Sequence, residues 1–316
     1  MEIYLPIAEL SVNVLVMLAM GIAIGFISGL FGVGGGFLLT PLLIFTGIPP
    51  AVAVATVTPQ LVASSTSAAV TYWRRGAIDF RLAGILILSG SIGSVAGAYL
   101  FAELQSSGQL DLVIAVSYTI FLGVIGGLML NESARALMRI GRRKTAGGAG
   151  AAERRAGEHK WIHRLPLKIR FRQSRLYISV LPIAVLGLAI AFLGTLLGIG
   201  GGFIMVPALI YLLRVPTSIV VGTSLVQIVG TMAVATVMHS LASQTVDAVL
   251  ALILMVGGVM GAQFGASIGL MLKAEQLRLL LALLVLGVGV RFAVDLTLEP
   301  AAPYSFTEIG SPGAVR

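Results

Sequence analysis

The chain has 316 residues, of which 57% are hydrophobic and only 11% are charged, and its formal net charge is +8. Such a composition cannot present the charged surface of a water-soluble protein, so we expect an integral membrane protein. The absence of cysteine excludes disulfides, thiolate metal sites and thiol catalysis.

Apolar runs long enough to cross a bilayer recur along the whole chain. A helix of about 20 residues crosses about 30 Å of hydrocarbon, whereas barrel strands are about half as long and alternate in polarity. The runs cover residues 14–31, 51–72, 80–100, 112–130, 178–197, 217–238, 248–272 and 277–296. The sequence therefore predicts an all-α polytopic membrane protein with at least eight full spans.

A glycine-rich stretch ends the first predicted span. "GLFGVGGGF", from Gly29 to Phe37, contains five glycines, and only the ten residues from Phe37 to Thr46 precede "GIPP". Ten helical residues cover about 15 Å, which is half of a bilayer. We therefore expect a helix that breaks at the glycines and a half-length helix after them, forming a hairpin whose tip lies deep in the membrane.

The central loop, residues 131–177, holds most of the positive charge. It carries 13 of the 21 Lys and Arg residues and three Glu, a net charge of +10. Its middle is rich in Gly and Ala, as in flexible linkers, and its end has the composition of a basic interfacial segment. The positive-inside rule places this loop in the cytoplasm, and we do not expect it to bind nucleic acid.

An internal repeat divides the chain into two related halves. "GLFGVGGGFLLTPLL" at Gly29 recurs as "TLLGIGGGFIMVPAL" at Thr195, an offset of 166 residues. Farther on, "ATVTPQL" matches "GTSLVQI", Asp79 matches Asp247, and "GSIGSVAGA" matches "GVMGAQFGA". We predict a first membrane repeat at 1–130, the linker loop at 131–177, a second repeat at 178–298 and a tail at 299–316. Each repeat has a glycine-broken hairpin plus three spanning helices, which gives eight to ten membrane segments.

The basic residues between the spans predict the orientation of both repeats. With the central loop in the cytoplasm, the connection "WRRGAIDFR" also lies inside, whereas "ELQSSGQLD", which has no basic residue, lies outside. Both termini then lie outside, and the two repeats have inverted topology. Arg74 and Arg75 are interpreted first as topology determinants, and an inner vestibule that attracts anions is the alternative.

The two glycine turns are the first candidate for a binding site. A helix broken in lipid leaves backbone groups unpaired unless protein, water or a ligand meets them. Bare glycine amides at a helix start, together with the helix dipole, favour a small anion. The alternative is that the glycines only permit tight packing or a bend. The candidate residues are Gly34, Gly35, Gly36 and Phe37 in the first half, and Gly200, Gly201, Gly202 and Phe203 in the second.

Polar side chains in the third helix of each half are the second candidates. Gln60 and Gln227 occupy matched positions, and a glutamine has no easy partner for its amide within its own helix. For the Ser and Thr residues, helix packing and ligand contact stay equally open. The set is Thr56, Thr58, Gln60, Ser64 and Ser65, with Thr223, Ser224 and Gln227 in the second half.

Other conspicuous residues are assigned structural roles. Asp79 and Asp247 stand at helix starts and are predicted to be N-caps. His239 lies near a helix end, where solvation or capping is favoured over proton coupling. The GxxxG spacings that begin at Gly21, Gly93 and Gly261 are predicted to be seams of helix packing. Neither a nucleophile–base pair nor a metal-ligand cluster stands out, so we expect no enzyme activity and no cofactor.

The repeated GGGF with its downstream proline, the GTS-like third helix and the acidic residue that opens the fourth resemble the TauE/SafE family of sulfite and organosulfonate transporters. The first repeat departs from this pattern, because "ATV" replaces "GTS". The resemblance implies a two-repeat helical protein of the bacterial cytoplasmic membrane that moves small sulfur-containing anions, commonly outward. We expect a facilitative exporter with a small anionic substrate; an ion-coupled importer and an anion channel are the alternatives. We expect the protein to lie in the lipid bilayer. Its oligomeric state is left open, with a homodimer as one alternative.

Overall fold

The computed structural model describes residues 2–120, 123, 168–171, 173, 176–213 and 215–269. In its first half, β1 (Glu2–Leu5) and β2 (Leu10–Asn13) precede α1 (Val14–Phe31), α2 (Gly36–Phe45), α3 (Pro50–Arg74) and α4 (Phe80–Ser106). A further apolar helix covers Leu110–Ile120. In the second half, β3 (Lys168–Phe171) and β4 (Leu176–Ser179) precede α6 (Val180–Leu197), α7 (Gly202–Tyr211), α8 (Thr217–Met238), η2 (His239–Ser243) and α9 (Ala248–Gly269).

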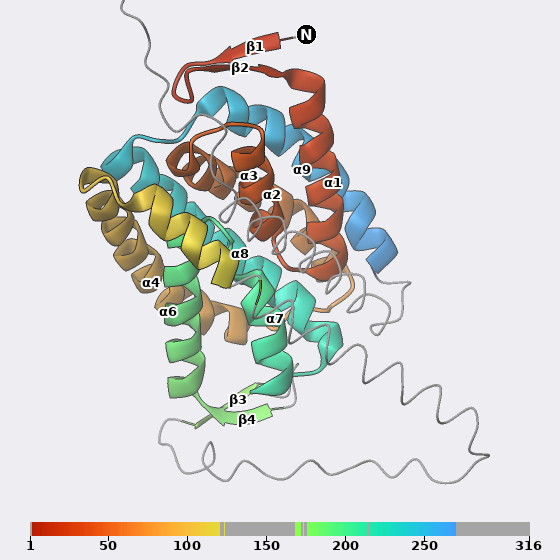
Figure 1. Cartoon of the computed structure of the whole chain (residues 1–316). Coiled ribbons are helices and arrows are strands. Elements are labelled where there is room, and N and C mark those ends of the chain that lie inside the picture. Colours follow the sequence, from red (N-terminus) through yellow and green to blue (C-terminus); the bar gives the residue numbers. More distant parts are fainter. Residues whose placement is uncertain are drawn as a thin grey trace, which may run out of the picture.

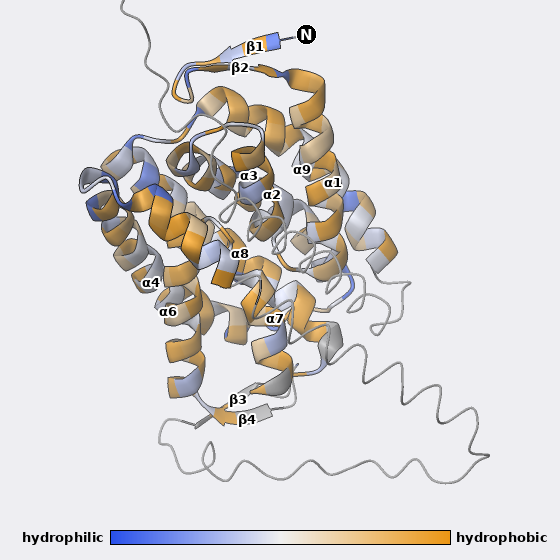
Figure 2. Cartoon of the chain, viewed as in Figure 1, coloured by the Kyte–Doolittle hydropathy of each residue, from blue (hydrophilic) through white to orange (hydrophobic). Residues whose placement is uncertain are grey.

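The predicted all-α polytopic class is confirmed. Five helices within the described ranges are long and apolar enough to cross a membrane: Val14–Phe31, Phe80–Ser106, Val180–Leu197, Ile219–Ser243 and Ala248–Gly269. Most residues along these helices are hydrophobic (Figure 2). The predicted span 277–296, the end of the span 112–130, most of the central loop and the tail lie outside the described residues.

Local sequence signals set the helix ends. Asn13 and Ser179 cap α1 and α6, because their side chains accept the N–H of the residue two positions later. Asp79 caps α4 by accepting the N–H groups of Arg81 and Leu82, and Asp247 likewise accepts those of Val249 and Leu250. The predicted capping role of both aspartates is confirmed.

Glycine seams hold the long helices together. On α1, a Cβ atom added to Gly25 or Gly29 would overlap the backbone of α9, at Gly258 and Ala262. On α4, a Cβ added to Gly93 would overlap Leu188 of α6 in the same way. Because lipid gives no hydrophobic drive for helix association, such close backbone approach supplies the packing energy. The GxxxG spacings are therefore packing seams, as predicted.

Two short antiparallel hairpins were not predicted. β1 pairs with β2, and β3 pairs with β4. The hairpins lie at opposite ends of the helical bundle and lead into α1 and α6 (Figure 1). The N–H of Ile7, in the turn of the first hairpin, donates to Asp247 at 3.0 Å and ties that hairpin to α9. β3 and β4 occupy the segment expected to be interfacial, and β4 crosses the predicted boundary at residue 178.

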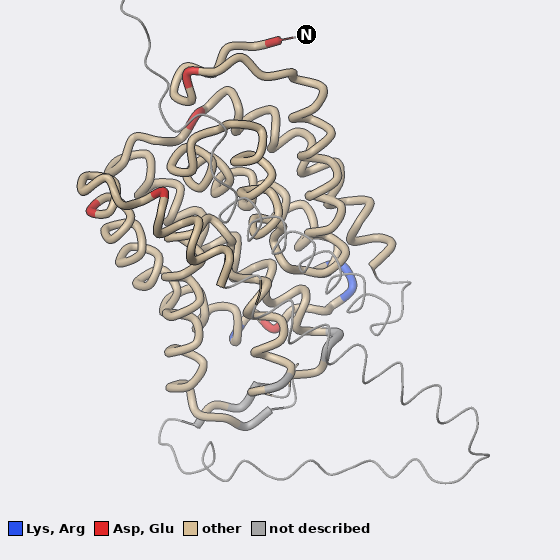
Figure 3. The backbone as a smooth tube through the Cα atoms, viewed as in Figure 1, with Lys and Arg blue, Asp and Glu red and all other residues tan. Residues whose placement is uncertain are grey.

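Within the described residues, charged side chains lie at turns and near helix ends. Figure 3 places the described Lys and Arg residues in the half of the bundle farther from β1 and β2, while most described acidic residues lie nearer to that hairpin. This separation of charge follows the pattern from which the orientation was predicted. The side of the membrane that each end faces stays a prediction.

Candidate functional site

The two glycine turns have the same backbone conformation. Gly32 ends α1 with φ 68°, and Gly198 ends α6 with φ 67°; both are left-handed. Gly35 and Gly201 precede α2 and α7 with φ 73° and 76°. Residues other than glycine rarely adopt such angles, so each turn requires glycine for its backbone alone. The helices that follow are ten residues long, as the half-length prediction requires.

The structure brings the two turns into contact. A Cβ added to Gly36 would overlap the carbonyl oxygen of Gly198, and one added to Gly202 would lie 2.5 Å from that of Val33. Phe37 and Phe203 stack, with ring centroids 4.5 Å apart and an interplanar angle of 15°. The hydroxyl of Thr40 also donates to the Gly198 carbonyl, at 3.3 Å. The N-termini of α2 and α7 therefore meet near the centre of the fold.

Two apolar side chains from the third helices lie against these turns. A Cβ added to Gly34 would lie 3.0 Å from Cδ1 of Ile228, and one added to Gly200 would lie 2.8 Å from Cδ1 of Leu61. Both side chains are fully buried. Leu61 and Ile228 directly follow Gln60 and Gln227, so α3 and α8 place matched residues on the two turns. Neither residue was predicted, because an apolar residue in an apolar helix carries no signal of contact with a site.

The two glutamines lie in different environments, although both are fully buried. Neither amide atom of Gln60 has a hydrogen-bond partner among the described residues, and its Nε2 lies against Gly258 of α9. Gln227 donates from Nε2 to Oγ1 of Thr231, one turn later, at 3.1 Å, and its Oε1 is unpartnered there. The expectation that a glutamine finds no partner within its own helix is wrong for Gln227, because Thr231 stands four residues ahead.

All the candidate hydroxyl groups except that of Ser65 make hydrogen bonds to the protein in this conformation. Thr58 donates to the Ala55 carbonyl at 2.8 Å, and Ser224 donates to the Gly32 carbonyl at 3.0 Å. Thr223 accepts the N–H of Asp79 at 3.1 Å. These contacts favour helix packing, one of the two roles left open for these residues.

Thr56 and Thr223 make equivalent contacts between the halves. Thr56 accepts the N–H of Asp247 at 3.0 Å, as Thr223 accepts that of Asp79. Each third helix is thus bonded to the start of the fourth helix of the other half, α9 or α4. Of the remaining candidates, Ser64 donates weakly to the Leu61 carbonyl at 3.4 Å, and Ser65 has no partner among the described side chains.

A second matched pair ties the far end of each third helix to the turn before the glycine break. The Tyr72 hydroxyl donates to the Gly29 carbonyl at 3.3 Å, and Nε2 of His239 lies 3.2 Å from the Thr195 carbonyl. His239 is fully buried and contacts Phe101 edge-on, with ring centroids 4.6 Å apart. Of the two roles expected for His239, solvation is wrong, because its ring is buried against Phe101 and the Thr195 carbonyl, whereas its position as the C-cap residue of α8 agrees with capping.

A bundle of membrane-length helices around two converging broken hairpins defines a polytopic membrane transporter. The chain belongs to the sulfite exporter TauE/SafE family, whose sequence profile matches residues 17–292. It is 28% identical over 282 residues to a probable membrane transporter protein of Xylella fastidiosa strain 9a5c, covering 88% of this chain and 94% of that protein. It is 26% identical over 287 residues to the probable membrane transporter protein YunE of Bacillus subtilis, covering 87% and 95%.

A plant relative matches over a shorter stretch. Sulfite exporter TauE/SafE family protein 1 of Arabidopsis thaliana is 36% identical over 85 residues, which are 27% of this chain and 19% of that protein. No solved structure matches the chain.

Proposed function

We propose that the protein exports a small sulfur-containing oxyanion, sulfite or an organosulfonate, across the bacterial cytoplasmic membrane by alternating access. The family description and the name of the plant relative both refer to sulfite export. The bacterial relatives of similar length are described only as probable membrane transporters. The identity of the anion and the direction of its movement are therefore part of this proposal.

The observation that carries the proposal is the meeting of two glycine-flanked helix starts. The first N–H groups of a helix have no partner within that helix, and its dipole adds roughly half a positive charge there. Gly35 and Gly201 precede α2 and α7 without a side-chain cap. Two such ends in contact provide donors from both halves for one compact anion.

The turns are closed in the conformation described. Phe37 stacks on Phe203, and Leu61 and Ile228 lie against Gly200 and Gly34. An anion reaches the amides only after these side chains separate. In transporters built of two repeats, one repeat rocks against the other around the central site, which opens each side in turn. The closed contact is thus the occluded state of the proposed cycle.

The membrane potential supplies the driving force. A cell interior negative by about 100 mV favours the exit of a monovalent anion by about 2.3 kcal/mol. Within the described residues, no Asp or Glu lies in the middle of a helix that is long enough to span, so the proposal assigns proton coupling to no carboxylate there. Export along this potential needs no second ion.

Proteoliposomes test this function directly. Vesicles loaded with sulfite should release it faster when the interior is made negative with a potassium gradient and valinomycin, and the rate should saturate with sulfite concentration. A rate that rises linearly without saturation would show a channel instead. Sulfoacetate, thiosulfate and sulfate in the same assay would identify the preferred anion.

A further inference from the structure

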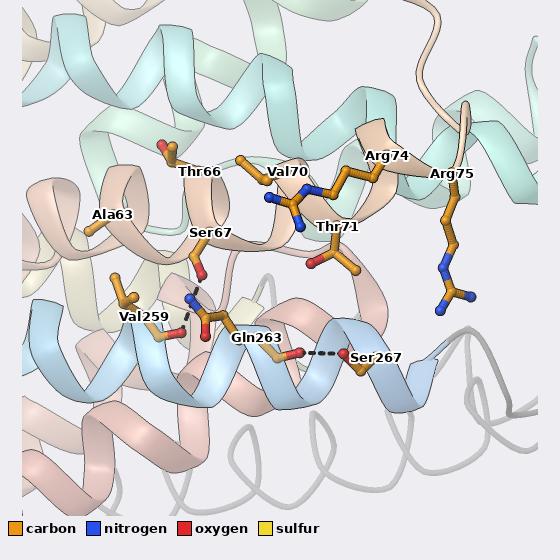
Figure 4. Close-up of a pocket in the computed structure, with 10 residues that line it drawn as sticks. All are labelled: Ala63, Thr66, Ser67, Val70, Thr71, Arg74, Arg75, Val259, Gln263 and Ser267. Atoms are coloured by element: carbon orange, nitrogen blue, oxygen red, sulfur yellow. Dashed lines mark hydrogen bonds between the residues drawn. The ribbon is translucent and has the colours of Figure 1, made fainter.

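A polar groove of about 730 Å³ opens between α3 and α9 (Figure 4). Seven of its ten lining residues are polar or basic and none is acidic. The polar residues on the two helices include Ser67, Thr71 and Gln263, and Arg74 and Arg75 stand at the end of α3. Figure 4 shows the Arg74 guanidinium folded back over the groove beside Thr71. The groove is therefore basic at one end and lined with uncharged polar groups along its length.

The polar face of α3 continues from this groove to the buried Gln60. Gln60, Ser64, Ser67 and Thr71 are spaced by four, three and four residues, which places them on one face of the helix. The Nε2 atom of Gln60 lies against Gly258, the residue before the groove-lining Val259. This stripe leads from the two arginines to an amide that has no partner among the described residues.

In the second half, the counterparts of the polar and basic groove residues are apolar or aromatic. α8 packs on α4 as α3 packs on α9, and Gln60 and Gly258 match Gln227 and Gly90. With the same offsets, the counterparts of Thr66, Ser67, Thr71, Arg74, Gln263 and Ser267 are Ala233, Val234, Met238, Leu241, Val95 and Tyr99. Packing of this helix pair therefore does not require the polar residues of the groove. The equivalent surface of α8 and α4 lacks them, so the polar groove belongs to the α3–α9 pair alone.

The free donors of the groove suit an anion. Among the described residues, Thr71, Arg74 and Gln263 make no side-chain hydrogen bond, so their donors face the groove or solvent. Guanidinium groups bind oxyanions through paired N–H donors, and amide and hydroxyl groups add single hydrogen bonds. Because no carboxylate lines the groove, no negatively charged side chain in it repels an oxyanion, including one that carries two negative charges.

We propose that the α3–α9 groove is a capture site for the transported small oxyanion, on the side of the membrane that Arg74 and Arg75 face. The arginines attract the anion, Thr71 and Gln263 hydrogen-bond it, and the polar face of α3 passes it toward Gln60. The positive-inside rule assigns this side to the cytoplasm, where an exporter must collect its substrate. The identity of the anion rests on the proposed function.

Sided transport kinetics test the groove. In right-side-out and inside-out vesicles, the double variant Arg74→Gln/Arg75→Gln should raise the sulfite KM about tenfold from the groove side and leave it unchanged from the other side. The wild-type KM on the groove side should also rise with salt, and the double variant should lose much of that dependence. Arg81→Gln is the matched control, because Arg81 is exposed on the same predicted side and does not line the groove. If the double variant has the same sulfite KM and salt dependence as Arg81→Gln, the proposed capture site is wrong.

Sulfite binding to the purified protein in zwitterionic nanodiscs separates the two proposals. Binding that depends on Arg74 and Arg75, without transport, supports the groove and overturns the proposed export. Transport with a KM that is unaffected by replacing both arginines contradicts the capture site but not the proposed export. Absence of both sulfite binding and transport contradicts both proposals.

An anionic lipid headgroup offers the same chemistry as the soluble anion. If anionic lipid copurifies with the wild type, is lost from the double variant, and sulfite binding is equal in both, the groove binds lipid and the proposal is wrong.

Discussion

At the scale of single residues, backbone conformation decides what can stand in the glycine turns. Gly34 has φ 87°, in the left-handed region, and lies between Ile228 and Leu61. Gly47, in the turn after α2, has φ 91°, but a Cβ added there would meet nothing within 4 Å. The two positions therefore share the same backbone demand and differ in what surrounds them.

This pair isolates the role of the turn in transport. Gly34→Ala and Gly47→Ala should each lower the free energy of unfolding by about 1–2 kcal/mol, because alanine disfavours the left-handed region. Only Gly34→Ala should also slow sulfite efflux, since its methyl group enters the volume proposed for the anion. Thermal unfolding and efflux on the same preparations measure both effects. Equal efflux by the two variants would assign the glycines to packing alone.

Replacing Gln60 and Gln227 by leucine should affect thermal stability differently. Gln60→Leu removes an amide with no partner among the described residues, so thermal stability should stay the same or rise. If that amide hydrogen-bonds the anion, the variant should bind sulfite about ten- to hundredfold more weakly, a loss of about 1.5–3 kcal/mol. Gln227→Leu should lower stability, because it removes the bond to Thr231. A Gln60→Leu protein with lower stability and normal affinity would contradict the proposed role.

At the scale of elements, the small-residue seams decide how the long helices pack. A Cβ added to Gly261 of α9 would overlap the Ile22 carbonyl of α1, whereas one added to Gly84 of α4 would meet nothing within 4 Å. Both glycines lie inside helices, so alanine gains helix propensity at each. Close approach of two backbones is the difference between them.

Gly261→Ala should therefore lower the free energy of unfolding by about 1–3 kcal/mol, because α1 and α9 must move apart. Gly84→Ala should leave it unchanged or raise it by up to about 1 kcal/mol. Thermal unfolding of both variants in one detergent provides the measurement. Equal melting temperatures of Gly261→Ala and Gly84→Ala would show that α1 and α9 tolerate a methyl group at position 261.

The sequence predicted helices better than contacts. Hydrophobic length alone located α1 and α8 at their observed bounds, Val14–Phe31 and Thr217–Met238. The glycine repeat located both half-length helices, because a left-handed turn followed by a helix start has a strong local signature. The two β-hairpins were missed, since four-residue strands have no periodicity that separates them from loops. Leu61, Ile228 and the α3–α9 groove depend on which helices meet, and one sequence does not show this.

At the scale of the whole molecule, the orientation of the two repeats across the membrane is still a prediction. The hairpins β1–β2 and β3–β4 lie at opposite ends of the bundle (Figure 1), and the basic residues that the structure describes lie in the half away from the first hairpin (Figure 3). The predicted orientation places the residue 131–177 loop in the cytoplasm and the connection after α4 outside.

Two cysteine variants test this orientation against a background free of native thiols. Gly148→Cys, in the central loop and outside the described residues, should react with a membrane-impermeant maleimide only after the cells are opened. Ser107→Cys, exposed just after α4, should react in intact cells. Labelling of position 148 from outside would invert the proposed topology and move the α3–α9 groove to the outer face.

The central claim is that one small oxyanion is held where the N-termini of α2 and α7 meet. Selenite has the pyramidal shape of sulfite, and its selenium scatters X-rays anomalously, so crystals soaked in selenite locate the bound anion without ambiguity. We expect an anomalous peak within hydrogen-bond distance of backbone amides at Gly34–Gly36 and Gly200–Gly202. A peak at any other position alone, or none at a concentration that saturates transport, would contradict it.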